Sequence, residues 1–199
     1  MAEAARALAR IEKDAFHLAN DPVPFVRTEL DPQHPFHLHF VVLGPPGTLI
    51  QGGVYHGMVK MCEKYPFKQP KICFLSCHMP DFLGKTFINL YNDDEWLPIF
   101  TLSTVISQIY QLLLEWSEEA EQGPKWDDEV SERASTAVQS RWAALKDAKL
   151  AQLFPEIIHD LQTKRNMEIE ARLQLAAATQ RQPSFFHRLL LLIACGARR

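Results

Sequence analysis

The side chains most able to do chemistry in this 199-residue chain are its four cysteines. A cysteine thiolate is a strong nucleophile near neutral pH and a good zinc ligand. Cys73, Cys77 and His78 lie close together, but no second pair of ligands follows at the spacing of a zinc site, so we predict neither a metal site nor a cofactor. Cys62 and Cys195 do not complete a disulfide framework either, which favours a reducing compartment.

Two histidines of an expected strand form a second candidate site. His37 and His39 share one face of the strand, because side chains two residues apart point the same way. This placement would bring two metal ligands together. A solvated sheet face explains the pair more simply, since antiparallel sheets often expose one face to water, and we favour that interpretation.

Composition restricts the class of protein. Hydrophobic residues make up 47% of the chain and charged residues 23%, which is enough for one domain with a core and an appendage. The net charge of −3 gives no basic surface of the kind that binds nucleic acid, so we exclude nucleic acid as a partner. The first 30 residues lack the apolar stretch of a secretory signal, and we expect an intracellular protein.

The first half of the chain predicts a helix followed by a sheet. Residues 2–21 are rich in helix formers and place Leu8, Ile11 and Ala15 on one face before prolines end the pattern. Four short segments rich in β-branched and aromatic residues come next, separated by Pro and Gly. They predict a four-stranded antiparallel meander formed by VPFVRTEL, FHLHFVVLG, GGVYHGMVKM and KICFLSC.

The second half predicts helices, so the fold class is α+β. From Thr101 onward, apolar residues at i, i+3 and i+4 indicate a core helix capped by Thr101 or Ser103. After a polar connection, a long helical pattern begins near Asp127 and runs past Leu150. Pro155 should bend or divide this pattern, and a helical extension continues to about residue 180.

Several motifs resemble the ubiquitin-conjugating enzyme (E2) family. GPPGTLIQGG is similar to its Gly-Pro, Gly-Thr and Gly-Gly hairpin region, YPFKQP to its Tyr-Pro-Phe-x-x-Pro segment, and WLP to its Trp-x-Pro. DPVPFV, GGVYHG, AVQS and LKDAKLAQLFPEII resemble the tail-anchored E2s of the endoplasmic reticulum membrane. Together these motifs are specific and cover about residues 8–165. They imply a UBC-like domain at 1–165, followed at 166–199 by a helical extension and a short apolar tail.

The two groups that the family uses for thioester chemistry are not recognisable. In E2s a cysteine thiolate accepts ubiquitin, and a nearby asparagine amide donates to the developing oxyanion. INL stands where the family has an Ile-Cys-Leu type motif, so Asn89 replaces the nucleophile, or Ile88 if the alignment shifts by one residue. HMPDFLG offers Asp81 in place of the amide, and an ionised carboxylate repels an oxyanion. The resemblance implies a degenerate site of Asp81, Ile88, Asn89 and Trp96 without catalytic activity.

One surface is expected to bind protein partners. E2s present a small apolar patch to ligases beside the first helix, and the resemblance carries this patch to six positions: Arg6, Arg10, Lys13, Met61, Pro98 and Ile99. The alternative is that Met61 and Ile99 are ordinary exposed apolar side chains, which every protein has.

The C-terminal tail is apolar but short. A helix of the nine uncharged residues 189–197 would rise about 13 Å, against roughly 30 Å of bilayer hydrocarbon, so it cannot span a membrane alone. We expect the tail to contact a membrane surface or a groove on a partner subunit. We favour the groove, because LLLLI has no polar face. The tail residues are Phe185, Phe186, Leu189, Leu190, Leu191, Leu192 and Ile193.

Three functions fit this sequence. The one we favour is an inactive E2-like binding or scaffold protein that engages ubiquitin-pathway partners. The second is a structural accessory subunit of a larger membrane-associated complex unrelated to ubiquitin transfer, and the third is an active E2 that uses Cys77 or Cys62 instead. The resemblance implies the cytosolic face of the endoplasmic reticulum, while the residues themselves leave another organelle membrane open, for example the mitochondrial one.

Overall fold

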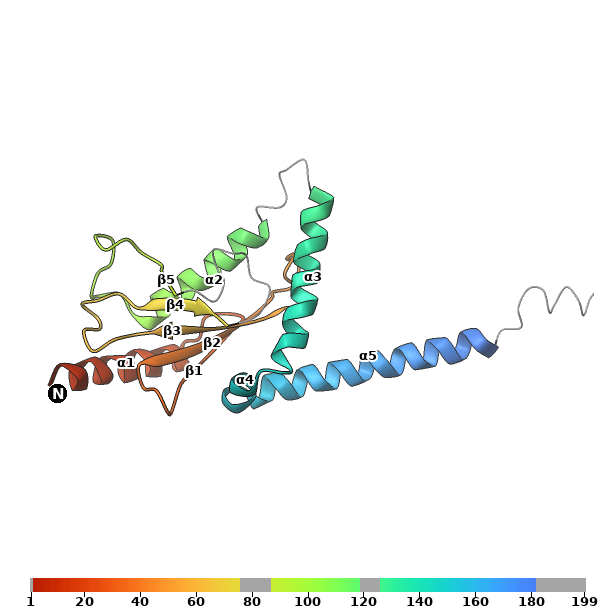
Figure 1. Cartoon of the computed structure of the whole chain (residues 1–199), viewed down its shortest axis with the longest axis horizontal. Coiled ribbons are helices and arrows are strands. Elements are labelled where there is room, and N and C mark those ends of the chain that lie inside the picture. The colour runs from red at the N-terminus through yellow and green to blue at the C-terminus, as the bar shows by residue number, and fades with distance from the viewer. Residues whose placement is uncertain (1, 76–86, 119–125, 182–199) are drawn as a thin grey trace, which may run out of the picture. The chain divides into compact units, whose positions relative to one another are not determined.

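The computed structural model of this chain describes residues 2–75, 87–118 and 126–181 (Figure 1). It separates into two compact units, residues 1–158 and residues 159–199. The division falls inside the last helix, α5 (Pro155–Arg181). The boundary expected after residue 165 stays a prediction.

The first unit is built on an antiparallel sheet whose strands follow one another in sequence order. The four predicted strands are present, and a fifth strand of two residues pairs with the fourth. Two residues are too few to show an alternating pattern, so this strand could not be predicted from the sequence. The strands are β1 (Val26–Leu30), β2 (His37–Leu43), β3 (Val54–Lys60), β4 (Lys71–Phe74) and β5 (Ile88–Asn89).

The main core lies between one face of the sheet and two helices, α1 (Ala2–Asn20) and α2 (Leu102–Glu118). Ile11 of α1, Phe40 of β2 and Ile106 of α2 are almost completely buried in it. Both helices carry apolar residues at helical spacing, as predicted. Thr101 caps α2, because its hydroxyl oxygen accepts a hydrogen bond from the Thr104 amide at 3.3 Å.

The other face of the sheet is covered by the C-terminal helices. The long helix predicted from Asp127 past Leu150 is wrong, since the chain forms α3 (Trp126–Ala144) and then α4 (Ala148–Leu153). The break has a local cause: Asp147 caps α4 by accepting a hydrogen bond from the Leu150 amide at 2.9 Å. Pro155 divides the pattern again, as predicted, and opens α5. No helix among residues 2–75, 87–118 and 126–181 is long and apolar enough to cross a membrane.

The solvated face predicted for His37 and His39 is wrong for His39, which is only 3% exposed. His39 points to the face that carries α4, where its ring contacts His56 of β3. The expectation failed because C-terminal helices, rather than water, cover this part of the sheet. His37 is half-buried.

Candidate functional site

The segment expected to hold the nucleophile forms β5. Ile88 pairs with Ile72 of β4 and packs against the core, whereas Asn89 pairs with Lys71 and its side chain is exposed. Of the two candidate positions, Asn89 is therefore the one that faces solvent. A carboxamide and an alkyl side chain both lack the nucleophilic electron pair of a thiolate. Asp81, Cys77 and His78 lie outside the described residues, as does the apolar tail from Phe185 to Ile193.

Trp96 supports the segment that follows β5. Its indole Nε1 donates a 2.7 Å hydrogen bond to the Pro66 carbonyl oxygen, and its ring contacts Tyr91 and Phe100. Only 7% of Trp96 is exposed. This residue therefore ties residues 91–100 to the Tyr65–Pro66 turn, which is a structural role rather than a chemical one.

Of the two described thiols, Cys73 lacks the surroundings of a catalytic cysteine. Cys73 is buried, burial raises the pKa of its thiol, and Sγ lies 3.6 Å from the Phe74 carbonyl oxygen. A nucleophilic cysteine needs a lowered pKa and access to solvent. Cys62 is half-buried in the turn after β3. Within the part of the chain that the structure describes, no group of three or more His, Cys, Asp or Glu could hold a metal ion.

Arg10 joins two parts of the expected partner surface. Its guanidinium donates to the carbonyl oxygens of Pro98 and Phe100 at 3.1 and 2.9 Å, which places α1 against the segment that precedes α2. Ile99, between these two carbonyls, is 78% exposed. Arg6 and Lys13 are exposed elsewhere on α1.

The assignment of Met61 to this surface is wrong. Met61 is 3% exposed and belongs to the core, because the chain after β3 turns inward and the Met61 amide bonds to the Phe36 carbonyl. Phe67, in the turn before β4, is 81% exposed. Nothing in the local sequence predicts this exposure, so only the turn geometry reveals it.

A buried carboxylate holds this region together. Asp14 of α1 accepts hydrogen bonds from the Tyr65 hydroxyl at 2.8 Å and from the Leu102 amide at 3.3 Å, and it pairs with Arg10 at 2.9 Å. Burial, reinforced by the nearby Asp14 carboxylate, raises the pKa of Tyr65. This cluster could not be predicted from the sequence, because an Arg and an Asp four residues apart on a helix usually form a solvated pair.

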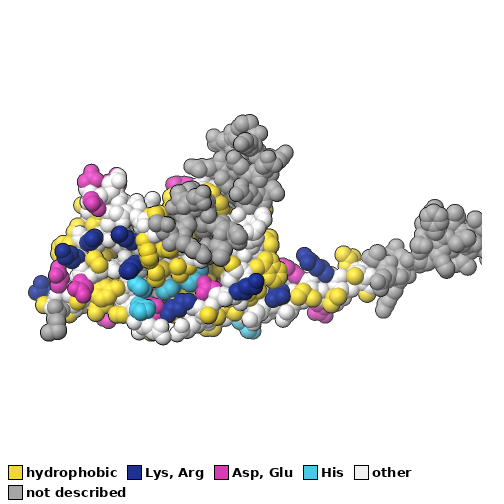
Figure 2. Space-filling model, viewed as in Figure 1, with side chains coloured by type: hydrophobic (Ala, Val, Ile, Leu, Met, Phe, Trp, Pro, Cys, Tyr) yellow, Lys and Arg dark blue, Asp and Glu magenta, His cyan; other side chains and the backbone are white. Residues whose placement is uncertain are grey.

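A second polar cluster connects the sheet to α4. His56 Nδ1 lies 2.7 Å from Asp147 Oδ2, and His56 Nε2 lies 2.9 Å from His39 Nδ1. Beyond His39, its Nε2 lies 3.7 Å from Asp31 Oδ2, and Lys149 of α4 donates to Asp31 Oδ1 at 2.9 Å. Figure 2 shows His side chains gathered on one face of the molecule beside acidic and basic ones.

Burial sets the charge state of this cluster. It lowers the pKa of His39 to about 4, with a further contribution from neighbouring His56, so His39 is neutral at pH 7. Burial alone would raise the pKa of Asp31, but hydrogen bonds from the Gln33 amide and from Lys149 lower it overall. The pKa of Asp147 is also lowered, because hydrogen bonds from His56 and the α4 backbone outweigh its burial.

Comparison with known proteins identifies similar sequences. The family described as "Ubiquitin-conjugating enzyme" matches residues 10–145. Human "Ubiquitin-conjugating enzyme E2 J2" is 30% identical over 173 residues, which cover 82% of this chain and 63% of the relative. "Ubiquitin-conjugating enzyme E2 6" of Debaryomyces hansenii is 25% identical over 175 residues, covering 85% of this chain and 70% of the relative. The chain thus spans less than two thirds of the human protein's length.

Among solved structures, human "Ubiquitin-conjugating enzyme E2 G1" is 24% identical with a TM-score of 0.46. The match covers 54% of this chain and 94% of that chain.

Proposed function

The chain belongs to the ubiquitin-conjugating enzyme family, and from that premise we propose that it is an inactive member that binds or scaffolds ubiquitin-pathway partners. The observation that supports the proposal is that neither expected position of the nucleophile holds a cysteine: Asn89 is exposed on β5, and Ile88 beside it packs against the core. The sequence contains no cysteine between Cys77 and Cys195 that could replace it nearby.

The chemistry of the remaining groups supports inactivity. A thioester forms only when a thiolate attacks the activated carboxyl carbon of ubiquitin, and the nitrogen of an amide side chain does not perform this attack. The burial of Cys73 and the raised pKa of its thiol oppose such a role. Asp81 adds a second change, because a carboxylate disfavours the oxyanion that an amide would stabilise.

The preserved frame supports a binding role. Asp14, Arg10 and Trp96 still connect α1, the Tyr65–Pro66 turn and the segment before α2 by hydrogen bonds of 2.7–3.3 Å. These contacts hold Ile99 on the surface. A protein that keeps this arrangement without the nucleophile retains a surface for partners but not the chemistry.

Incubation with ubiquitin-activating enzyme, ATP and ubiquitin tests the inactivity. Non-reducing electrophoresis should show no adduct that disappears with dithiothreitol, while an active E2 charged in parallel supplies the positive control. A reducible adduct that Cys77→Ala or Cys62→Ala abolishes would establish the alternative, an active E2 with a displaced cysteine.

Substitution of Ile99 tests the binding role. Ile99→Asp should weaken recovery of an E2-binding ligase domain about tenfold, because desolvated apolar side chains carry much of the energy of an interface. Met167→Asp is the matched control, since Met167 is 64% exposed but lies on α5. Equal recovery by both folded variants would mean that Ile99 does not contact the ligase.

A second function is favoured by one observation on α5. Four large apolar side chains of this helix are between 45% and 69% exposed and offer apolar surface to a partner: Met167, Ile169, Leu173 and Leu175. A subunit of a larger membrane-associated assembly would present such a helix. Identification of the proteins that purify with the tagged chain separates the two functions, because only the first predicts ubiquitin-pathway proteins. The endoplasmic reticulum is the membrane that the resemblance to tail-anchored E2s implies.

A further inference from the structure

Strand β1 is the edge of the sheet, and its hydrogen-bonding pattern can be assigned residue by residue. The Leu43 amide donates to the Phe25 carbonyl and the Asp31 amide donates to the His37 carbonyl. In an antiparallel pair the residues that bond to the neighbouring strand alternate, so Arg27 and Glu29 face β2 with their backbone groups. The backbone N–H and C=O of Thr28 therefore point away from the sheet.

Thr28 is the point on this edge where pairing can begin. The backbone of Val26 is already engaged, because its amide donates to the Val23 carbonyl at 3.1 Å and its carbonyl accepts from the Arg27 guanidinium at 3.0 Å. In the described ranges, the outward amide and carbonyl of Thr28 have no protein partner. A donor and an acceptor side by side on a strand edge are complementary to an extended backbone.

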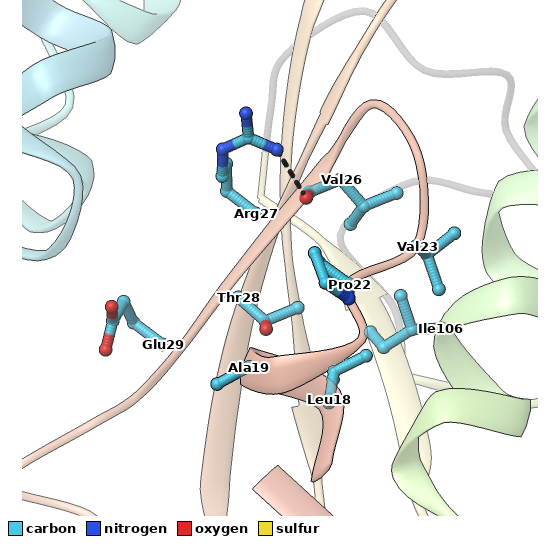
Figure 3. A pocket seen from close by; sticks show the side chains of 9 residues that line it. All are labelled: Leu18, Ala19, Pro22, Val23, Val26, Arg27, Thr28, Glu29 and Ile106. Atoms are coloured by element: carbon cyan, nitrogen blue, oxygen red, sulfur yellow. Dashed lines mark hydrogen bonds between the residues drawn. The ribbon is translucent and has the colours of Figure 1, made fainter. Parts of the chain in front are cut away.

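A cavity of about 340 Å³ lies directly beside this edge. Leu18 of α1, Val23 of the following loop and Ile106 of α2 give it an apolar wall (Figure 3). Thr28 points toward this wall, whereas Arg27 and Glu29 point away from it (Figure 3). Arg27 and Glu29 also line the cavity, but their charged ends point away from its apolar wall.

We propose that the β1 edge binds an extended segment of a partner protein that carries a basic, a large apolar and an acidic residue in succession. The segment adds an antiparallel strand, and its central residue exchanges two backbone hydrogen bonds with Thr28. Directly opposite side chains share a face, so the central side chain enters the cavity. The residue before it lies opposite Glu29 and the residue after it opposite Arg27, which sets the order of the charges.

Size and charge decide between this occupant and a second copy of the chain. The sequence Arg27-Thr28-Glu29 is itself basic, neutral and acidic, so two β1 edges would match in charge around a twofold axis. Thr28 at the centre is too small to fill the apolar cavity, whereas leucine or methionine would bury its side chain there. A separate segment with a large central residue therefore fits better. The site does not depend on Asn89 or on the proposed function.

The test uses the full-length ¹⁵N-labelled protein and the capped peptide Ser-Thr-Lys-Leu-Glu-Thr-Ser. We expect saturable binding with a Kd on the order of 100 µM and the largest amide shifts around Thr28. The peptide with N-methylated leucine should bind about tenfold more weakly, because it cannot donate to the Thr28 carbonyl. Exchange of lysine and glutamate should weaken binding about fivefold, and the double variant Arg27→Glu with Glu29→Arg should reverse this preference.

A pair of tryptophan variants tests the cavity. Ala19 lines the hollow from the exposed side of α1, so Ala19→Trp should fill it and reduce peptide affinity at least about tenfold. Glu12→Trp, at an exposed position of the same helix that does not line the cavity, should bind as the unchanged protein does. Circular dichroism verifies that both variants fold.

Three results would overturn the proposal. They are the absence of saturable binding, equal affinity for the N-methylated peptide, and an unchanged charge preference in the double variant. A dimer in sedimentation velocity that Thr28→Pro dissociates would show that a second copy occupies the edge instead. Proline at this position removes only the outward amide, which β2 does not use.

Discussion

At the residue scale, two buried histidines form a chain of polar contacts between the sheet and α4. The ionised Asp147 carboxylate accepts a hydrogen bond from His56 Nδ1 at 2.7 Å. His56 Nε2 lies 2.9 Å from His39 Nδ1, within hydrogen-bond distance. The chain of contacts runs from β2 through β3 to α4, and burial keeps His39 at its β2 end neutral at pH 7.

The burial of His39 predicts that mild acid weakens the fold. The pKa of His39 is about 4 in the folded protein and about 6.5 in the unfolded chain. Between these values the unfolded chain binds a proton that the folded protein does not, so the free energy of unfolding falls as pH decreases from 6.5 to 4. The loss attributable to His39 is at most about 3 kcal/mol, and most of it occurs below pH 6.5.

Replacement of His39 by asparagine isolates this contribution. Asparagine keeps an N–H donor where Nδ1 of His39 meets His56, but it does not titrate. Urea denaturation of His39→Asn should therefore show a smaller loss of stability between pH 6.5 and 4.5 than the unchanged protein. The groups that face His39 remain in both proteins: His56, Asp31, Lys149 and His37. If the free energy of unfolding fell equally with pH in both proteins, the acid sensitivity would come from those groups instead.

The residues that the sequence mispredicted share a physical reason. His39 and Met61 were expected at the surface, and both are buried by elements far away in the sequence or by a turn of the chain. Local pattern predicts which face a residue occupies, but not what covers that face.

At the element scale, one hydroxyl anchors α3 to the sheet. Ser140 Oγ is completely buried, accepts a hydrogen bond from the Val54 amide of β3 at 2.9 Å and donates to the Ala137 carbonyl of its own helix at 2.8 Å. It gives the first amide of β3 a partner that the sheet does not supply. The helix is thereby held against one end of β3.

Loss of this hydroxyl should destabilise the fold. Ser140→Ala leaves the buried Val54 amide without an acceptor, and we expect a loss of about 1–3 kcal/mol in the free energy of unfolding. Ser135→Ala is the matched control, because Ser135 lies exposed on the same helix and loses, besides the change in helix propensity, only an exposed hydrogen bond from Gln139 Nε2 at 2.9 Å. Chemical denaturation of both variants measures the difference. Equal stability of the two would mean that water replaces the hydroxyl at Val54.

The bounds of α1 and α2 could be predicted from the sequence, whereas the break between α3 and α4 could not. α1 and α2 have a distinct apolar face each, and their positions follow from periodicity and from the prolines and threonine at their ends. The break between α3 and α4 depends on the cap at Asp147, whose side chain also binds His56 across the fold. A residue that serves both a helix end and a tertiary contact cannot be recognised from helical spacing.

At the scale of the whole molecule, the E2-like unit holds its hydrophobic core and its polar clusters within residues 1–158. The α+β fold followed from the order of elements, and the family from its motifs. Less could be predicted about the second unit, since the exposed apolar side chains of α5 do not form a regular stripe. Its role depends on what it contacts, and the last residues of the chain offer the clearest test.

The apolar tail predicts a contact that lipid vesicles can identify. Residues 189–193 are continuously apolar, while Arg188, Arg198 and Arg199 flank them, so both length and charge oppose a free crossing of the bilayer. Burial of four leucines and an isoleucine contributes roughly 1.5–3 kcal/mol per side chain, which suffices for a bilayer interface or a protein groove before ordering costs are subtracted. We expect the groove, because an interfacial helix needs a polar face that this segment lacks.

Flotation with protein-free vesicles that contain anionic lipid distinguishes these two placements of the tail. If the tail binds a protein groove, both the full chain and the protein shortened to residues 1–184 should stay at the bottom of the gradient. Only the full chain should then recover its partners from membranes. Partner recovery is the control, because a tail that only aggregates would not recover partners. If the full chain floats, the shortened one does not, and both recover the same partners, then the tail binds lipid. The arginines would in that case lie at the headgroups, with Phe185 and Phe186 in the boundary below them.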